Sequence, residues 1–342
     1  MLIFTIFASG EQNINSNISA LTEAPDIKES NRTWVFRREI DKGLMGYYRS
    51  LDRMIRFLEK KENLSLYPKN YPKIMIRLDA SAGPGLQVSN LFLDALLEIL
   101  RLRSYKKEMI GLLTVNFSKL NRAPGFRSIT ENGFYKGHKI HSHRDNRFYA
   151  PNWFHDSPMP PKVHDRAKFY LEFPNDREKR IAEERKSYLP AVLLEDNVYW
   201  INLAVIMDDS NLGILGASSN MSLEMVSNAR RFREDPTLGA AAITEILAIP
   251  EIWEKRIFSI VGLSRFQFAG GDEFHAEFLG GDPVLLMSRN PFAVDSVAWA
   301  SLSDARKQKN FNPRNKEEAL IFEYSESLEL GQVMDPVVFN VP

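Results

Sequence analysis

The sequence contains no cysteine, and this absence removes a whole group of possible chemistries. Without a thiol the chain can form no disulfide, no thiolate nucleophile, no cysteine-ligated zinc site and no thiolate-held iron–sulfur cluster. A cysteine-free chain folds equally well in reducing and in oxidising surroundings, so the compartment stays open. We expect a protein without an iron–sulfur cluster, and the sequence identifies no other cofactor.

Long apolar runs and an excess of charge of one sign are also missing. The longest apolar run near the N-terminus covers residues 2–8, far short of the roughly 18 to 20 residues that span a bilayer. The 44 basic and 44 acidic residues cancel, so no overall field attracts nucleic acid or an anionic membrane. We therefore expect a soluble protein with no transmembrane segment and no nucleic-acid partner.

Residues 1–33 are polar and show no sustained hydrophobic period, which is typical of a flexible arm that the fold does not need. The apolar run 2–8, followed by Ser9, Gly10 and an asparagine-rich tract, is equally typical of the remnant of an export signal. Both interpretations stay open, and an exported protein fits the sequence as well as a cytoplasmic one. Folding is expected to begin near Trp34 and to give a single domain over 34–342.

Beyond the arm, short β-type runs alternate with helical periods, as in α/β proteins. The strand-like runs are 73–79, 109–117, 198–207, 256–263 and 284–288, and the main helical periods are 40–58, 88–99 and 292–306. The order strand, loop, helix, strand over 73–117 predicts two parallel strands joined by a right-handed crossover. The fold class is therefore expected to be α/β, with a mainly parallel or mixed sheet flanked by helices.

A loop-rich insertion is predicted over about 121–161, where aromatic residues alternate with proline and glycine. Long irregular segments in compact domains usually cover a site or bind a partner. The spacing of His138, His141 and His143 fits no familiar zinc pattern, so we predict no metal site there. Trp153 and Phe154 would mark the surface if the segment binds another protein.

Two polar loops follow predicted strands and are candidate sites. In the first, Ser81, Gly83 and Gly85 lie between a strand and a helix, where backbone N–H groups and the helix dipole can hold an anion, although a plain tight turn explains them as well. In the second, Asp208 and Asp209 are the candidate catalytic pair, as a general base or a cation ligand. They could equally cap the segment that follows.

A third loop joins the strand-like run 284–288 to a helix. Asn290 is expected to be the N-cap of the helix that Pro291 opens, and Asp295 lies in its first turns, where a carboxylate gains from the dipole. Arg289 beside it could bind an anion. Earlier in the chain, Asn220 either ends a helix or contacts a ligand. Because parallel strands end at one edge of a sheet, we expect Ser81, Asp208 and the Arg289–Asn290 pair to converge there.

Three segments resemble the domain of unknown function 362 family. That family shares a strand, glycine-bearing loop and helix, a later G-A-x-x-N element, and a late D-P-x-A-x-D segment. The matching pieces here are 77–97, then 200–220 with Gly216-Ala217-Ser218-Ser219-Asn220, and 289–299 with Asn290-Pro291-Phe292-Ala293-Val294-Asp295. Ser219 and Asn290 stand where family members commonly carry lysine and aspartate. The resemblance implies a fold and a position for the site, and it implies no reaction.

These observations predict that the chain binds a small anionic ligand at the carboxyl ends of its strands, with or without an enzymatic reaction. The alternative is a non-catalytic exported or surface protein that binds a protein partner through its aromatic loops. A concave pocket with perturbed ionisable groups favours the first, and an exposed apolar patch around Trp153 and Phe154 favours the second.

Overall fold

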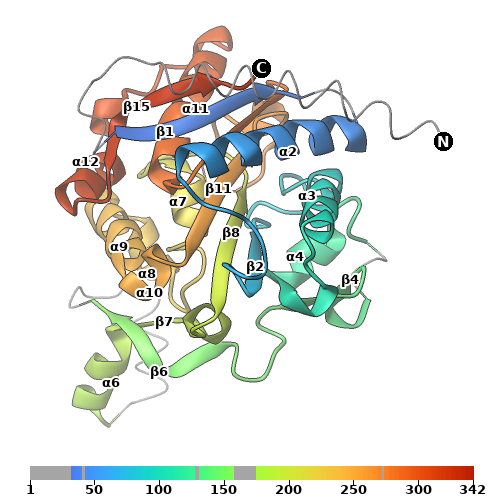
Figure 1. The fold of residues 1–342 in the computed structure, drawn as a ribbon. Helices are drawn as coiled ribbons and strands as arrows, with labels where there is room; N and C mark the ends of the chain where they lie inside the picture. The colour runs from blue at the N-terminus through green and yellow to red at the C-terminus, as the bar shows by residue number, and fades with distance from the viewer. Residues whose placement is uncertain (1–31, 41–42, 128–130, 158–174, 272) are drawn as a thin grey trace.

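A computed structural model describes residues 32–40, 43–127, 131–157, 175–271 and 273–342. Its largest sheet contains β1 (Arg32–Glu39), β2 (Lys73–Leu78), β3 (Ile110–Leu113), β4 (Phe134–Tyr135), β5 (His138–His141), β8 (Val198–Ala204), β11 (Arg256–Gly262), β14 (Val284–Ser288) and β15 (Gln332–Asn340). The strand order is β15-β1-β14-β11-β8-β2-β3-β5-β4 (Figure 1). The expectations for 1–31, including a dispensable arm, lie outside the described residues, whereas residues 32 and 33, which were expected to belong to the arm, are part of β1.

The sheet is mixed, as expected for this α/β protein. From β11 through β8, β2 and β3 to β5, neighbouring strands are parallel, and β1 is parallel to β15. Strand β14 runs antiparallel to both of its neighbours, β1 and β11. The predicted parallel pairing of β2 with β3 through a helix is confirmed. The direction of β14 decides which residues meet at each edge of the sheet.

Helices cover both faces of the sheet, which explains why its central strands are almost wholly buried. The main helices are α2 (Leu44–Lys61), α3 (Asn90–Leu102), α9 (Pro236–Ala248), α11 (Pro291–Gln308) and α12 (Leu320–Ser327), together with the single turn α7 (Ala217–Asn220). Figure 1 shows α2 and α3 on one side of the sheet, with α7 and α11 on the other. No helix of the described ranges is long and apolar enough to cross a membrane.

Two of the strands near one edge of the sheet, β1 and β15, were not expected. Both mix charged and apolar residues and are only partly buried, so they lack the continuous apolar run that marks a central strand. The segment 121–161 is also more regular than predicted. It supplies β4 and β5 to the main sheet, and its β6 (Tyr149–Asp156) pairs with β7 (Lys186–Pro190) in a separate two-stranded sheet.

A buried carboxylate joins α11 to α7. Asp295 has no solvent exposure, and it accepts hydrogen bonds from the backbone N–H groups of Ala217 (2.6 Å) and Ser218 (2.8 Å) and from the Ser218 hydroxyl (2.6 Å). Asp295 therefore caps α7, whereas we expected its carboxylate to interact with the dipole of its own helix, α11. A side chain at Gly216 would place its Cβ 2.3 Å from Asp295 Oδ1, so only glycine leaves room for this contact.

The opposite end of α7 meets a buried guanidinium. Arg77 donates to the carbonyl oxygens of Asn220 (3.0 Å), Leu78 (3.0 Å) and Glu224 (3.3 Å). Burial lowers its pKa, and the nearby Asp79 and Glu224 oppose that shift. A carboxylate at the start of α7 and a cation at its end both complement the helix dipole. Arg77, Asn220 and Asp295 thus have structural roles in joining three distant segments of the chain.

The first prediction concerns the pH dependence of stability. Burial raises the Asp295 pKa from 3.8 to about 6, although its hydrogen bonds oppose the shift. Between about pH 4 and 6 the native state therefore holds a proton that the unfolded state has lost, so this group reduces stability as pH rises through that window. The free energy of unfolding of Asp295→Asn should not fall in this pH window, although the substitution weakens the cap of α7. Urea unfolding from pH 4 to 7 measures the difference in slope.

Asp304→Asn provides the matched control, because Asp304 lies exposed on the same helix and pairs only with the neighbouring Lys307 among the described residues. It should follow the wild-type curve. Parallel pH profiles for wild type and Asp295→Asn would contradict the raised pKa.

Candidate functional site: a cavity beside two arginines

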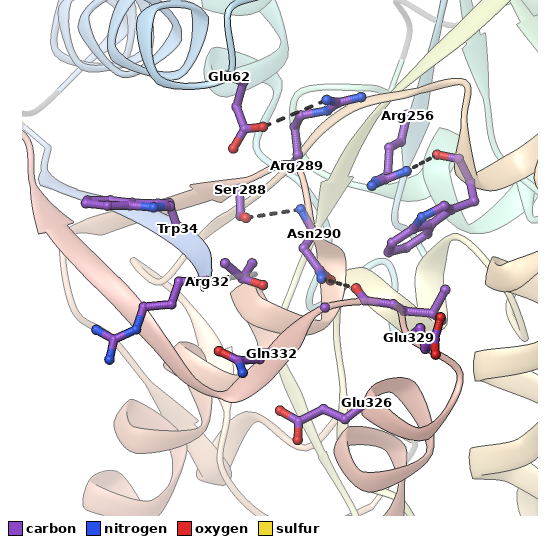
Figure 2. Close-up of a pocket in the computed structure, with 14 residues that line it drawn as sticks. Arg32, Trp34, Glu62, Arg256, Ser288, Arg289, Asn290, Glu326, Glu329 and Gln332 are labelled. Carbon is purple, nitrogen blue, oxygen red and sulfur yellow. Dashed lines mark hydrogen bonds and ion pairs between the residues drawn. The ribbon is translucent and has the colours of Figure 1, made fainter. Parts of the chain in front are cut away.

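A cavity of about 740 Å³ lies at the edge of the sheet where β1, β11 and β15 begin and β14 ends (Figure 2). Because β14 runs antiparallel to β11, it ends at the edge of the sheet where β11 begins, and its last residue, Ser288, pairs with Ser259 of β11. The cavity is lined by Arg32, Thr33, Trp34, Glu62, Trp253, Arg256, Ser288, Arg289, Asn290, Glu326, Glu329, Leu330, Gly331 and Gln332. Its volume is within the range of small-molecule sites.

Arg256 is held rigidly at one side of the cavity. Its guanidinium stacks 3.6 Å from the centre of the Trp253 ring, and Nη1 donates to the Trp253 carbonyl. Its Nε is buried and has no hydrogen-bond partner among the described residues. Burial and then the charge of Arg289 lower the Arg256 pKa to about 9. The guanidinium remains charged at neutral pH, but the protein compensates that charge poorly.

Arg289 presents a second guanidinium from the end of β14. Its Nη1 lies 3.8 Å from Glu62 Oε2, and both side chains are partly exposed, so this is a weak ion pair. Its Nε is also buried without a hydrogen-bond partner in the described part of the chain. Among those residues, Glu62 is the only carboxylate within 4 Å of either guanidinium. Of the two cations beside the open cavity, Arg289 therefore has one weak ion pair, and Arg256 has none among the described residues.

Asn290 joins three elements of the cavity wall. Its Oδ1 accepts from Phe292 N–H (3.0 Å), which confirms the predicted N-cap of α11. Its Nδ2 donates to the Leu330 carbonyl in the turn before β15 (2.6 Å), and its backbone N–H donates to the Ser288 hydroxyl (3.1 Å). The following Gly331 has φ 111°, a conformation that favours glycine, and its missing Cβ leaves room for Asn290 Nδ2.

The remaining charged residues lie away from the arginine pair. Figure 2 shows Glu326 and Glu329 on the opposite side of Asn290 from Arg256 and Arg289. Glu326 is on α12, and its Oε1 accepts from the backbone N–H groups of Val333 and Met334, near the start of β15. Neither glutamate has a cation within 4 Å among the described side chains. The cavity thus has a basic side and an acidic side.

The other candidate residues hold their own loops together. Asp79 Oδ1 accepts from the backbone N–H (3.0 Å) and hydroxyl (2.6 Å) of Ser81. A Cβ at Gly85 would lie 2.2 Å from the Phe274 ring, and one at Gly83 would lie 3.1 Å from the Ala80 carbonyl. These contacts support the tight-turn interpretation of the loop. Whether it also binds a ligand remains a prediction.

Asp208 and Asp209 are both engaged near the end of β8. Asp208 is buried and forms ion pairs with Arg314 (2.9 Å) and Arg306 (3.2 Å). Asp209 accepts from the backbone N–H groups of Asn211 (2.9 Å) and Leu212 (2.7 Å), which closes the turn between β9 (Met207–Asp209) and β10 (Gly213–Leu215). Their catalytic role remains a prediction, while their structural roles are evident.

The buried side chain of Asn220 donates to the Asn202 side-chain oxygen (2.7 Å) and to the Leu203 carbonyl (3.3 Å). Asn220 is the last residue of α7, as one of the two interpretations expected, and its side chain also bonds to β8. This contact belongs to the core around α7 and lies outside the arginine-lined cavity.

The expected convergence of all three loops is wrong. The loops that hold Ser81 and Asp208 follow β2 and β8, two parallel strands, and so lie at the carboxyl edge of those strands. Arg289 and Asn290 lie at the opposite edge, because β14 is antiparallel to β11. Convergence of all three loops would require β14 to be parallel to β11. Arg256 was missed altogether, since a single arginine before an apolar run gives no signal of a site.

The histidines of the 121–161 segment are dispersed. His138 is buried on β5, and His143 Nε2 lies 2.6 Å from Tyr149 Oη. His141 and His155 lie near single carboxylates, Asp145 (3.4 Å) and Glu245 (3.1 Å) respectively. Within the described residues, no three histidine or acidic side chains form a metal-binding group. The absence of a structural metal stays a prediction, and His164 lies outside the described residues.

Comparison with known proteins adds little to this geometry. No protein-family profile matches the sequence, and no curated protein matches it significantly. A solved structure of a structural-genomics target from Thermotoga maritima is similar at 12% sequence identity and a TM-score of 0.36. The alignment covers 78% of this chain and 59% of the Thermotoga protein. That likeness is too weak to bear on function.

The second prediction tests the role of Asn290. Asn290→Ala removes both the helix cap and the bond to Leu330, each worth about 1 kcal/mol, so the free energy of unfolding should fall by about 2 kcal/mol. Asp235→Ala is the matched control, because Asp235 only caps α9 through Leu238 N–H (3.0 Å) among the described contacts, and it should cost about 1 kcal/mol. Urea unfolding measures both values. Equal losses would show that the Leu330 bond contributes nothing.

Proposed function

We propose that this protein binds a small molecule through an anionic group of that molecule, which Arg256 and Arg289 contact at the cavity. The observation that carries the proposal is the pair of guanidiniums that line one cavity, with Glu62 as the only carboxylate within 4 Å of either one among the described residues. A largely buried charge is costly unless it is compensated. An anion in the cavity beside the two guanidiniums would supply that compensating charge and would accept hydrogen bonds from their remaining N–H groups.

The geometry suits a carboxylate or a phosphate. A guanidinium presents donors in a planar fork that matches two oxygen atoms of such a group. Stacking on Trp253 fixes the plane of Arg256 before a ligand arrives, so little side-chain entropy is lost on binding. An anion also relieves the repulsion between the two arginines. The Glu62 carboxylate offers only a weak contact to one of them.

A chemical reaction is not part of the proposal. The cavity lining contains neither histidine nor lysine. The alternative, binding of a protein partner through aromatic loops, has less support. Trp153 and Phe154 are both partly buried, and Phe154 packs against Tyr188 with ring centres 5.7 Å apart.

The third prediction tests the anion site. Titration calorimetry at low ionic strength should detect binding of acetyl-trialanine, succinate or inorganic phosphate to the wild type. Arg256→Gln and Arg289→Gln should each weaken that binding by about 10-fold to 100-fold, because a hydrogen bond to a charged group is worth roughly 1.5 to 3 kcal/mol.

Arg101→Gln is the control, since Arg101 lies exposed on α3 and pairs with Glu98. It should bind these anions like the wild type. The proposal fails if none of the anions binds, or if the three variants bind them equally.

A further inference from the structure

The charges that line the cavity balance in number. The lining contains three arginines (Arg32, Arg256 and Arg289) and three glutamates (Glu62, Glu326 and Glu329). Glu62 lies beside Arg289, whereas Glu326 and Glu329 lie on the other side of Asn290 (Figure 2). A site for a multiply charged anion would be expected to carry an excess of positive charge. This lining carries none, so it is poorly suited to a polyanion and suits a ligand that is itself neutral overall.

Apart from the weak Glu62–Arg289 pair, the charged side chains that line the cavity form no ion pairs with one another among the described residues. Arg256 forms no ion pair, and Glu326 and Glu329 have no cation within 4 Å, in the part of the chain that the structure describes. Asn290 lies between the arginine pair and the two glutamates, Glu326 and Glu329 (Figure 2). Its bond to Leu330 holds the turn that contains Glu329 in place relative to the end of β14. The protein thus keeps opposite charges apart beside one open volume.

Helix α12 reinforces the acidic side. Glu326 lies in the last turn of α12. Glu329 lies just beyond the end of this helix, with a backbone φ of 57°. The carboxyl end of a helix carries partial negative charge from its free carbonyl groups. Both the side chains and the helix end therefore favour a cation at this side of the cavity. A primary ammonium group has three donors and suits carboxylate and carbonyl acceptors.

We infer that the ligand is a zwitterion, a short peptide or amino acid whose carboxylate meets Arg256 and Arg289 while its ammonium group meets Glu326 and Glu329. This inference rests on the proposed anion site and adds the second charge. The cavity volume of about 740 Å³ favours a peptide over a single amino acid, because sites of this size hold drug-sized ligands.

Calorimetric titrations of the full chain with three peptides test the two charges separately. Trialanine carries both charges, acetyl-trialanine lacks the ammonium group, and trialanine amide lacks the carboxylate. Trialanine should bind about tenfold or more tightly than either blocked peptide, because each block removes a charge-assisted contact. Glu326→Gln together with Glu329→Gln should abolish the preference for trialanine over acetyl-trialanine and leave the affinity for acetyl-trialanine unchanged. Because Glu326 also anchors β15, Glu329→Gln alone is a second variant, which should reduce the preference without disturbing the fold.

Glu323→Gln is the control, since Glu323 is exposed on α12 and does not line the cavity. It should keep the full preference for trialanine. If acetyl-trialanine binds as tightly as trialanine, and Arg256→Gln weakens both, the zwitterion inference is overturned while the anion site stands. If neither trialanine nor any anion binds the wild type, the proposed function and this inference fall together.

Discussion

The hydrogen bonds of one side chain, Asn290, shape the cavity. Its amide oxygen caps α11 and its amide nitrogen holds the turn before β15, so a single residue fixes the end of β14 relative to two other elements. Arg289 precedes it directly and is therefore positioned by the same bonds. A buried amide satisfied at both atoms is rigid. This rigidity keeps the basic and acidic sides of the cavity apart.

Strand β14 supplies the second constraint. Inserted antiparallel between β1 and β11, it carries Arg289 to the edge where Arg256 begins β11. The two arginines thereby come close to each other: burial lowers the pKa of Arg256, and the charge of Arg289 lowers it further. The carboxyl edge of the parallel strands is organised differently. There Asp79 and Asp208 are satisfied by neighbouring protein groups.

Sequence patterns predicted the fold class, the five central strand-like runs and the Asn290 cap, because these depend on local periodicity and on residues adjacent in the chain. The patterns could not reveal the direction of β14, which is determined by pairing with strands distant in sequence. They placed Arg289 and Asn290 among the ligand-binding candidates but at the wrong edge of the sheet. Arg256 could not be found, since its burial and its stacking on Trp253 arise only from tertiary packing.

The central claim is that an anion lies between Arg256 and Arg289. The Nε–H resonances of the arginine side chains, followed by NMR during a titration with acetyl-trialanine, test it most directly. Both resonances should shift together with one dissociation constant, because one anion contacts both guanidiniums, while that of Arg101 stays in place. Binding that leaves the resonances of Arg256 and Arg289 unmoved would contradict the claim.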